Sequence, residues 1–203
     1  MHATGQVVSV AGARDDADLE KLEGALNTIC GPSIVVHACT RAADDFNARF
    51  DARSRTYVYA IFTGAVADPW LGRTAWHHAG ALDVDAMNEA AGHLLGRRDF
   101  SSFGRVPAPD ASAQRTLYEL SCSASGAIVR VRARADSFIQ QMVRSLVGTL
   151  VSVVRGKRQP DSIPGVIAAA DRSAAGVVAP PHGLCLVAVE YDSGWSRPFD
   201  PFQ

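Results

Sequence analysis

Apolar and polar residues recur along this chain with two spacings, and each spacing predicts a type of element. Alternation, or a short apolar run rich in β-branched and aromatic residues, predicts a strand. Apolar residues three and four positions apart predict a helix. The predicted strands span Thr4–Val10, Ser33–Cys39, Arg53–Phe62, Arg115–Ser123, Ala127–Ala135 and Leu184–Tyr191. The predicted helices span Asp15–Thr28, Leu82–Leu95, Phe138–Val154 and Ser162–Ala170.

The order of these elements indicates a fold class. Strands and helices follow one another without an internal repeat or a low-complexity linker. Neighbouring strands joined by short turns favour antiparallel pairing, and amphipathic helices cover one side of such sheets. We therefore expect an α+β protein built from antiparallel-rich sheets with packed helices.

The strand predicted over Arg53–Phe62 carries unusual side chains. Its alternation places Arg55, Tyr57 and Tyr59 on one face. A strand face with an arginine and two tyrosines fits two alternatives equally well. It is either a wet edge of the sheet or the floor of a cleft.

The helix predicted over Phe138–Val154 has a single arginine, Arg144, in its apolar middle. A guanidinium stays charged under all ordinary conditions, and a buried charge needs an opposite partner. Arg144 is therefore expected to point at an anion or into a cleft that binds one.

Composition excludes a partner held by bulk charge. The 203 residues contain 20 Lys and Arg against 21 Asp and Glu, a formal charge of −1. Non-specific DNA or an anionic membrane would need a strongly basic chain. A local patch remains possible, since Arg130, Arg132 and Arg134 share one face of a predicted strand. The alternative is an ordinary solvated strand face.

The sequence predicts neither a metal site nor a disulfide framework. Cys30, Cys39, Cys122 and Cys185 form no CxxC pair and no Cys/His cluster. The N-terminal residues do not resemble a secretory signal, and no apolar run reaches membrane-spanning length without a charge. We expect a reduced, cytoplasmic protein without a membrane segment.

Several blocks, in order along the chain, resemble the TruA family of tRNA pseudouridine synthases. HATGQVV resembles the segment that follows the family's catalytic GRTDAGVHA motif. DFNARFDARSRTYVYAIF resembles its F-H-A-R-F block and R-x-Y-x-Y strand, and GRRDFSSF its G-x-x-D-F-S-S-F loop. ADSFIQQMVRSLVGTL is similar to its N-x-F-L-x-x-M-V-R-x-I-V-G helix, and APPHGLCLVAVEYD to its last strand.

The resemblance implies a fold and an activity. The fold is that of pseudouridine synthases, with two antiparallel-rich sheets, packed helices and ferredoxin-like or RRM-like halves. The activity is the isomerisation of uridine to pseudouridine in the anticodon stem-loop of tRNA, by a homodimer without a metal or other cofactor. An aspartate of the GRTDAG motif acts as the nucleophile on a flipped-out nucleoside.

The resemblance also carries roles over to single residues. Tyr57 matches the tyrosine that lies against the uracil, and Arg144 the arginine that pairs with the nucleophilic aspartate. Arg55, Phe138 and Met142 are expected around the substrate. Arg49, Arg130, Arg132 and Arg134 are expected to bind RNA. Asp99, Phe100 and Phe103 match the loop, where a capped, core-anchored loop is the better prediction.

The departures from the family pattern concern the nucleophile. The GRTDAG motif is missing, and Asn47 stands where the family has histidine. We therefore expect an N-terminally truncated synthase, with a domain remnant over residues 1–48 and a C-terminal α/β domain over 49–203. The alternative is a non-catalytic RNA-binding module derived from the same fold. The DNA upstream of the Met1 codon discriminates between the two.

Overall fold

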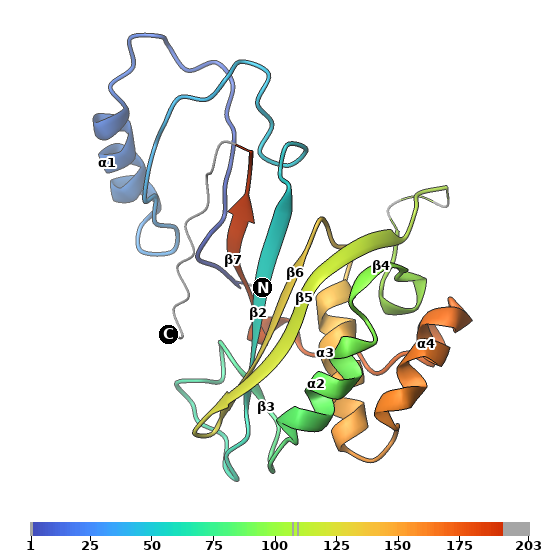
Figure 1. The fold of residues 1–203 in the computed structure, drawn as a ribbon. Helices are drawn as coiled ribbons and strands as arrows, with labels where there is room; N and C mark the ends of the chain where they lie inside the picture. Colours follow the sequence, from blue (N-terminus) through green and yellow to red (C-terminus); the bar gives the residue numbers. More distant parts are fainter. Residues whose placement is uncertain (1, 107, 109, 193–203) are drawn as a thin grey trace. The chain divides into compact units, whose positions relative to one another are not determined.

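Residues 2–106, 108 and 110–192 are described by the computed structural model of the chain, and they fold as two units (Figure 1). The larger unit contains residues 2–6 and 52–192, and the smaller one is Val7–Asp51. The sequence assigned residues 1–48 to an N-terminal remnant. Residues 2–6 nevertheless belong with the larger unit, because they pair with its last strand.

The larger unit is organised around one seven-stranded sheet with the order β1-β7-β2-β6-β5-β4, and β3 extends it beside β2. Strands β7, β2, β6, β5 and β4 pair antiparallel, whereas β1 pairs parallel with β7 and β3 parallel with β2. The strands are β1 (His2–Ala3), β2 (Ser54–Phe62), β3 (Trp76–His77), β4 (Gly96–Asp99), β5 (Gln114–Ser125), β6 (Ile128–Ala135) and β7 (Leu184–Glu190).

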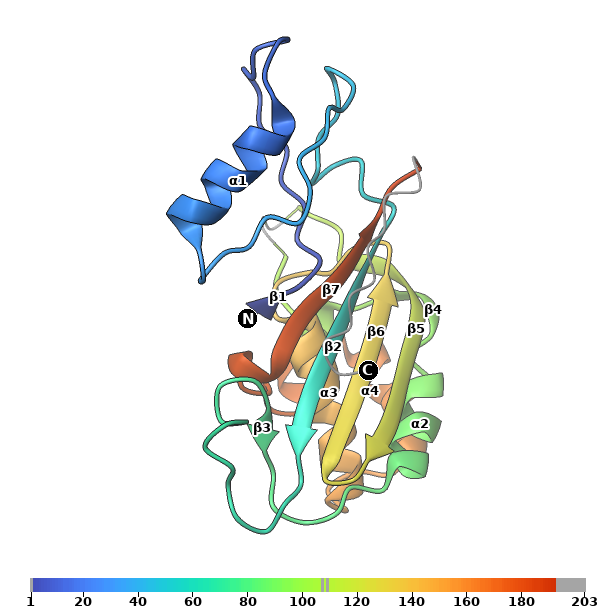
Figure 2. The same cartoon turned by 90° about the vertical axis from the view of Figure 1, so that its left-hand side faces the viewer.

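Three helices of the larger unit cover one face of this sheet (Figures 1 and 2). They are α2 (Val84–Gly92), α3 (Met142–Val154) and α4 (Ile163–Ala169). Short 3-10 turns connect them at Ser101–Phe103, Pro160–Ser162, Arg172–Ala174 and Pro181–Gly183. Helix α3 is almost entirely buried, because its apolar residues face both the sheet and the neighbouring helices.

The hydrophobic core lies between the sheet and these helices. Tyr59 and Ile61 of β2 and Val131 of β6 meet Leu146 and Leu150 of α3, and all five side chains are fully buried. A second, small cluster on the opposite face of the sheet contains Val58, Cys185 and Val187. The β strands therefore alternate between a helix-covered face and a helix-free face.

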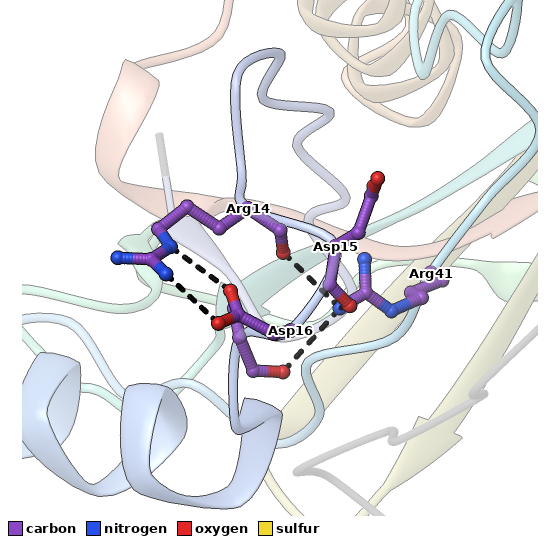
Figure 3. Close-up of polar contacts among 5 residues, drawn as sticks. Arg14, Asp15, Asp16 and Arg41 are labelled. Carbon is purple, nitrogen blue, oxygen red and sulfur yellow. Dashed lines mark hydrogen bonds and ion pairs between the residues drawn. The ribbon is translucent and has the colours of Figure 1, made fainter.

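The smaller unit contains one helix, α1 (Leu19–Cys30), and two polar anchors. Asp18 caps the helix by accepting a hydrogen bond from the Lys21 amide. In the loop before it, Arg41 donates to the carbonyls of Arg14 and Asp15 at 3.2 and 2.5 Å (Figure 3). Arg41 follows the helix in the chain. Residues 7–51 are all described by the structure, and none of them is buried.

Two predicted strands are absent from the described residues. Thr4–Val10 and Ser33–Cys39 are irregular, although both are rich in apolar residues. A regular strand needs a neighbour along its whole length. The first segment joins β7 at its start, where the amides of Thr4 and Gly5 donate to the Leu186 carbonyl, but it forms no regular strand beyond that point. In the second segment the Asn27 side chain replaces that neighbour, since its amide donates to the Val36 carbonyl and accepts from the Val36 amide.

Two further predictions need correction. The sequence predicted two sheets, whereas the described residues form one. The helix expected from Phe138 begins instead at Met142. Gln141, directly before it, has a left-handed backbone with φ 68°, which interrupts the helical path. The helices over 15–28, 82–95 and 162–170 and the hairpin of β5 and β6 are confirmed, with boundaries shifted by a few residues.

Candidate active site

Strand β2 brings Arg55, Tyr57 and Tyr59 onto the helix-covered face. These residues pair with Ala135, Ala133 and Val131 of β6, which belong to the core. The shared face predicted from alternation is therefore confirmed. Because β2 lies between β7 and β6, the wet-edge alternative is wrong.

The Tyr57 ring is partly buried and forms one wall of the candidate site. Its ring meets that of Phe138 edge to face, with centroids 5.2 Å apart and an interplanar angle of 87°. Burial raises the pKa of Tyr57, and the nearby Arg55 charge opposes that shift. Within the described residues its hydroxyl forms no hydrogen bond, so it is available to a ligand.

Arg55 fixes the loop that carries Phe138. Its Nη1 donates to the Asp136 carbonyl at 3.0 Å. The Asp136 carboxylate in turn accepts hydrogen bonds from the amides of Thr116 and Ser137. Phe138 is thus held against Tyr57 by a loop whose polar groups are satisfied.

Arg144 lies in the first turn of α3 and is only partly buried, unlike its neighbours Val143 and Ser145. Its Nε donates to the Ala179 carbonyl at 2.6 Å, and the Ala179 amide donates back to the Arg144 carbonyl at 3.1 Å. Among the described residues Arg144 forms no ion pair. Its two terminal nitrogens are therefore free to bind an anion.

Tyr59 is fully buried, and its hydroxyl is used inside the protein. It donates to the Pro180 carbonyl at 2.7 Å, one residue beyond the carbonyl that binds Arg144. Burial raises the pKa of Tyr59 strongly, and the charge of Arg144 opposes this shift. The two side chains bind adjacent carbonyls, so the guanidinium and the phenol meet the same part of the chain.

The segment 176–180, which we call the strap, lies directly against α3. A Cβ atom on Gly148 would come within 1.7 Å of the Val177 carbonyl oxygen, and one on Gly176 within 2.7 Å of the Gly148 oxygen. The Gly176 amide also donates to the Thr149 hydroxyl at 2.9 Å. Two glycines therefore permit a helix–strap approach that no larger side chain allows.

An open hollow of about 490 Å³ lies beside the start of α3. It is lined by Gly104, Arg105, Gln141, Arg172, Ser173, Ala175, Gly176, Val177 and Val178. Gly176, Val177 and Val178 of the strap form one of its sides.

Comparison with known proteins places this chain in a family. The sequence profile described as "tRNA pseudouridine synthase" matches residues 90–192. The chain is 35% identical to tRNA pseudouridine synthase A of Geotalea uraniireducens over 94% of its own length and 78% of the relative. It is 38% identical to the proteins of that name from Moorella thermoacetica and Burkholderia mallei, covering 77% and 73% of them. The chain belongs to the tRNA pseudouridine synthase A family.

The structure gives the surroundings of two further residues for which the family resemblance implies a binding role, Met142 and Arg49. Met142 is fully buried in the core, so it supports the site from beneath rather than forming an exposed wall. Arg49 belongs to the smaller unit, where its guanidinium stacks on the Phe50 ring at 5.4 Å.

The row of Arg130, Arg132 and Arg134 lies on the face of the sheet opposite Tyr57 and Arg144. These arginines alternate along β6 with Val129, Val131 and Ala133, which belong to the core. Arg132 pairs with Glu119 at 3.4 Å, and Arg134 with Glu190 at 3.7 Å. The row therefore forms a partly exposed basic stripe on the helix-free face, and its binding of RNA stays a prediction.

The matched loop is anchored in the core, as predicted. Phe100 and Phe103 are fully buried, with ring centroids 6.0 Å apart. Asp99 caps the turn by accepting from the Ser101 amide at 2.8 Å. The turn that they form packs against α3 and α4.

Two features of the described residues bear on cofactors and membranes. No cluster of three His, Cys, Asp or Glu side chains suitable for a metal ion occurs among them. Within the same residues, every helix is too short or too polar to cross a bilayer.

Sequence reasoning missed the strap and its two contacts with the site. The Ala-Pro-Pro-His-Gly block was recognised only as the start of the last strand. The atoms that contact Arg144 and Tyr59 are the carbonyl oxygens of Ala179 and Pro180. Every residue has a carbonyl oxygen, so the residue types do not reveal this role. The two prolines were the available signal, since they indicate a fixed extended path.

Proposed function

We propose that this chain carries the uracil-binding part of a tRNA pseudouridine synthase that converts uridine to pseudouridine in the anticodon stem-loop. One observation supports this best. The free hydroxyl of Tyr57 and the guanidinium of Arg144, which has no ion-pair partner among the described residues, lie on the same helix-covered side of β2. We also propose, from the family resemblance, that the enzyme acts in the cytoplasm as a homodimer and uses no cofactor.

The proposed reaction begins with a nucleoside flipped out of the RNA, which costs least in a loop or a frayed stem end. An aspartate attacks the nucleoside, and the bond between ribose carbon and uracil nitrogen breaks. The uracil rotates and forms a carbon–carbon bond to the ribose. Formation of this bond breaks the bond between the ribose and the aspartate and releases the carboxylate. The proton of that uracil carbon then leaves, and the uracil nitrogen freed from the ribose takes up a proton, so that the product is an isomer of the substrate.

Tyr57 contributes a stacking face and a hydroxyl to this reaction. The ring, held by Phe138, offers a surface for the uracil. Since burial raises its pKa, Tyr57 keeps its proton at neutral pH. Its part in removing the carbon-bound proton is therefore a relay through the hydroxyl rather than the action of a preformed phenolate.

Arg144 contributes a fixed positive charge for the nucleophile. A carboxylate removed from water has a raised pKa, and a neighbouring guanidinium lowers it again. With Nε bound to Ala179, Arg144 presents its two terminal nitrogens. This end-on approach suits a carboxylate with two oxygens. The GRTDAG motif that carries the family's nucleophilic aspartate does not occur in the 203 residues.

Reading the codons upstream of Met1 and then assaying the encoded protein tests the proposal. Unmodified tRNA is incubated with the 203-residue chain and with a form extended upstream through the Gly-Arg-Thr-Asp-Ala-Gly motif, both in EDTA. We expect pseudouridine, measured by nucleoside mass spectrometry, only from the extended form. An extended form that binds tRNA without producing pseudouridine would favour the non-catalytic RNA-binding module.

The role of Tyr57 has its own test in the extended form. Tyr57→Phe keeps the stacking face and removes the hydroxyl, so kcat should fall about 10²-fold or more while tRNA affinity changes little. Tyr191→Phe removes a hydroxyl from another tyrosine of the larger unit and should leave kcat unchanged. Equal, small effects of the two substitutions would assign Tyr57 to the core.

A further inference from the structure

The strap is held by helix α3 on one side and by the sheet on the other, and the Tyr59 side chain makes the contact from the sheet. On the helix side, Gly148 and Gly176 allow backbone contact, and the Thr149 hydroxyl binds the Gly176 amide. Thr149 is itself tied to the Ser145 carbonyl at 2.8 Å. On the sheet side, the Tyr59 hydroxyl binds the Pro180 carbonyl. The strap is thus clamped between α3 and β2.

The Tyr59 side chain has a fixed position from which to act. Its ring meets Trp76 edge to face at 6.4 Å, and a Cβ on Gly183 would come within 2.7 Å of the ring. With no exposed surface, Tyr59 has no room for another rotamer. Its hydroxyl therefore defines where the Pro180 carbonyl lies.

The next residue of the strap transmits this position to Arg144. Ala179 contacts Arg144 through both backbone groups, since its carbonyl accepts from Nε and its amide donates to the Arg144 carbonyl. Pro180 follows Ala179 directly, and the proline ring restricts the backbone of the residue before it. A shift of the Pro180 carbonyl must therefore turn the Ala179 carbonyl and the guanidinium with it.

We propose that Tyr59 is a positioning residue for the isomerisation. Its hydroxyl holds the strap so that the Ala179 carbonyl occupies Nε of Arg144 and leaves the two terminal nitrogens to face the nucleophile. This inference rests on the proposed function, in which Arg144 pairs with the nucleophilic aspartate. Arg144 has many rotamers in isolation, and the carbonyl selects one of them.

A double-mutant cycle in the extended, active enzyme tests this inference. The proteins are the parent, Tyr59→Phe, Arg144→Lys and the double variant, assayed for kcat and for KM toward tRNA. Tyr59→Phe keeps the ring packing and removes one hydrogen bond, so kcat should fall about 10-fold with KM nearly unchanged. Lysine keeps the charge but has no Nε–H to bind Ala179. Tyr59→Phe should therefore cause no further loss in the Arg144→Lys background.

Ile61→Val is the matched control, because Ile61 is fully buried two residues along the same face of β2. It should lower the melting temperature about as much as Tyr59→Phe does and leave kcat unchanged. Ala179→Gly is a second variant, which loosens the strap without altering Tyr59 or Arg144, and it should also lower kcat. It keeps the test decisive if Tyr59→Phe fails to fold.

Each outcome supports one conclusion. An unchanged kcat in Tyr59→Phe and Ala179→Gly, or a loss that adds fully to that of Arg144→Lys, overturns the positioning role while leaving the proposed function intact. An unchanged kcat in Arg144→Lys instead removes Arg144 from the proposed function, and the positioning role of Tyr59 falls with it. Full coupling in the cycle, with normal activity of Ile61→Val, supports both.

Discussion

Helices α1 and α3 have nearly the same length, 12 and 13 residues, and differ completely in burial. In α3 almost every side chain is buried, whereas α1 has none. Leu22 and Ile29 of α1 keep 40% and 79% of their surface exposed, although their spacing predicts an apolar face. The comparison teaches that the spacing of apolar residues predicts which face of a helix is apolar, but not whether other elements pack against that face.

The two units are consequently stabilised by different interactions. The larger unit relies on buried apolar surface, the dominant favourable contribution to folding. Val7–Asp51 relies on polar anchors such as Asp18, Asn27 and Arg41. A hydrogen bond of this kind contributes about 0.5–1.5 kcal/mol. The smaller unit should therefore open locally at a lower free energy than the larger one.

The largest expected effect is in the core. Leu146→Ala removes a fully buried side chain of α3 and should lower the free energy of unfolding by about 2–5 kcal/mol. Leu22→Ala, the same change in α1, should alter it by less than about 0.5 kcal/mol. Urea unfolding of both variants measures the difference. Similar losses in the two would mean that α1 is packed as tightly as α3.

An intermediate effect is expected at Arg41. Arg41→Gln removes the guanidinium that binds the carbonyls of Arg14 and Asp15, so the loop before α1 should loosen (Figure 3). Amide hydrogen exchange in α1 should accelerate about 5- to 10-fold, corresponding to roughly 1 kcal/mol, with no change in α3.

Arg14→Gln is the control for that measurement. It removes the exposed ion pair with Asp16 in the same loop and should have little effect. If exchange accelerates equally in α1 and α3 of the Arg41 variant, the two units unfold together and the comparison between them fails.

The smallest expected effect is a difference between the two units in how their stability changes as the pH falls. Burial, with the Arg155 charge, lowers the pKa of His78 below its ordinary 6.5. The unfolded chain then takes up a proton before the folded one does, so the larger unit should lose stability as the pH falls through about 6.5. His78→Phe should remove this dependence. Stability that stays constant from pH 7 to 5.5 would contradict the prediction.

Asp18 gives the smaller unit a different response. Hydrogen bonds from Lys21 lower the pKa of Asp18 below its ordinary 3.8. A carboxylate with a lowered pKa stabilises the folded state above that value, and the effect is lost as the pH falls further. The amide signals of α1 should therefore change below about pH 4, and Asp18→Asn should shift or abolish that change.

The sequence predicted the four long strands and the three helices of the larger unit and one face of the site, but not the short strands β1, β3 and β4. The two-residue period placed Arg55, Tyr57 and Tyr59 together, and the apolar helix around Arg144 was correctly expected to be buried. The same period grouped Arg130, Arg132 and Arg134 but contained no information on which sheet face the helices cover. Whether a strand face meets helices depends on contacts between segments that are distant in sequence.

Other features could not be predicted from the sequence because they too depend on contacts between segments or on backbone atoms. The apolar runs at Thr4–Val10 and Ser33–Cys39 have strand composition, yet a regular strand forms only along a partner, and the first run joins β7 at its start without continuing as a strand. The Asn27 contacts with Val36 show that one side chain can take the place of that partner. At the site, the roles of Ala179 and Pro180 reside in carbonyl oxygens that every residue possesses.

The place of β7 in the sheet has a consequence for how the protein folds. The last of the described strands lies between β1 and β2, which come first in the chain. The sheet therefore cannot close until the ribosome has released most of the chain, and such distant pairings slow folding. The strap leads directly into β7, so Arg144 acquires its orientation only in this final step. A nascent chain therefore contains Arg55 and Arg144 well before the candidate site has formed.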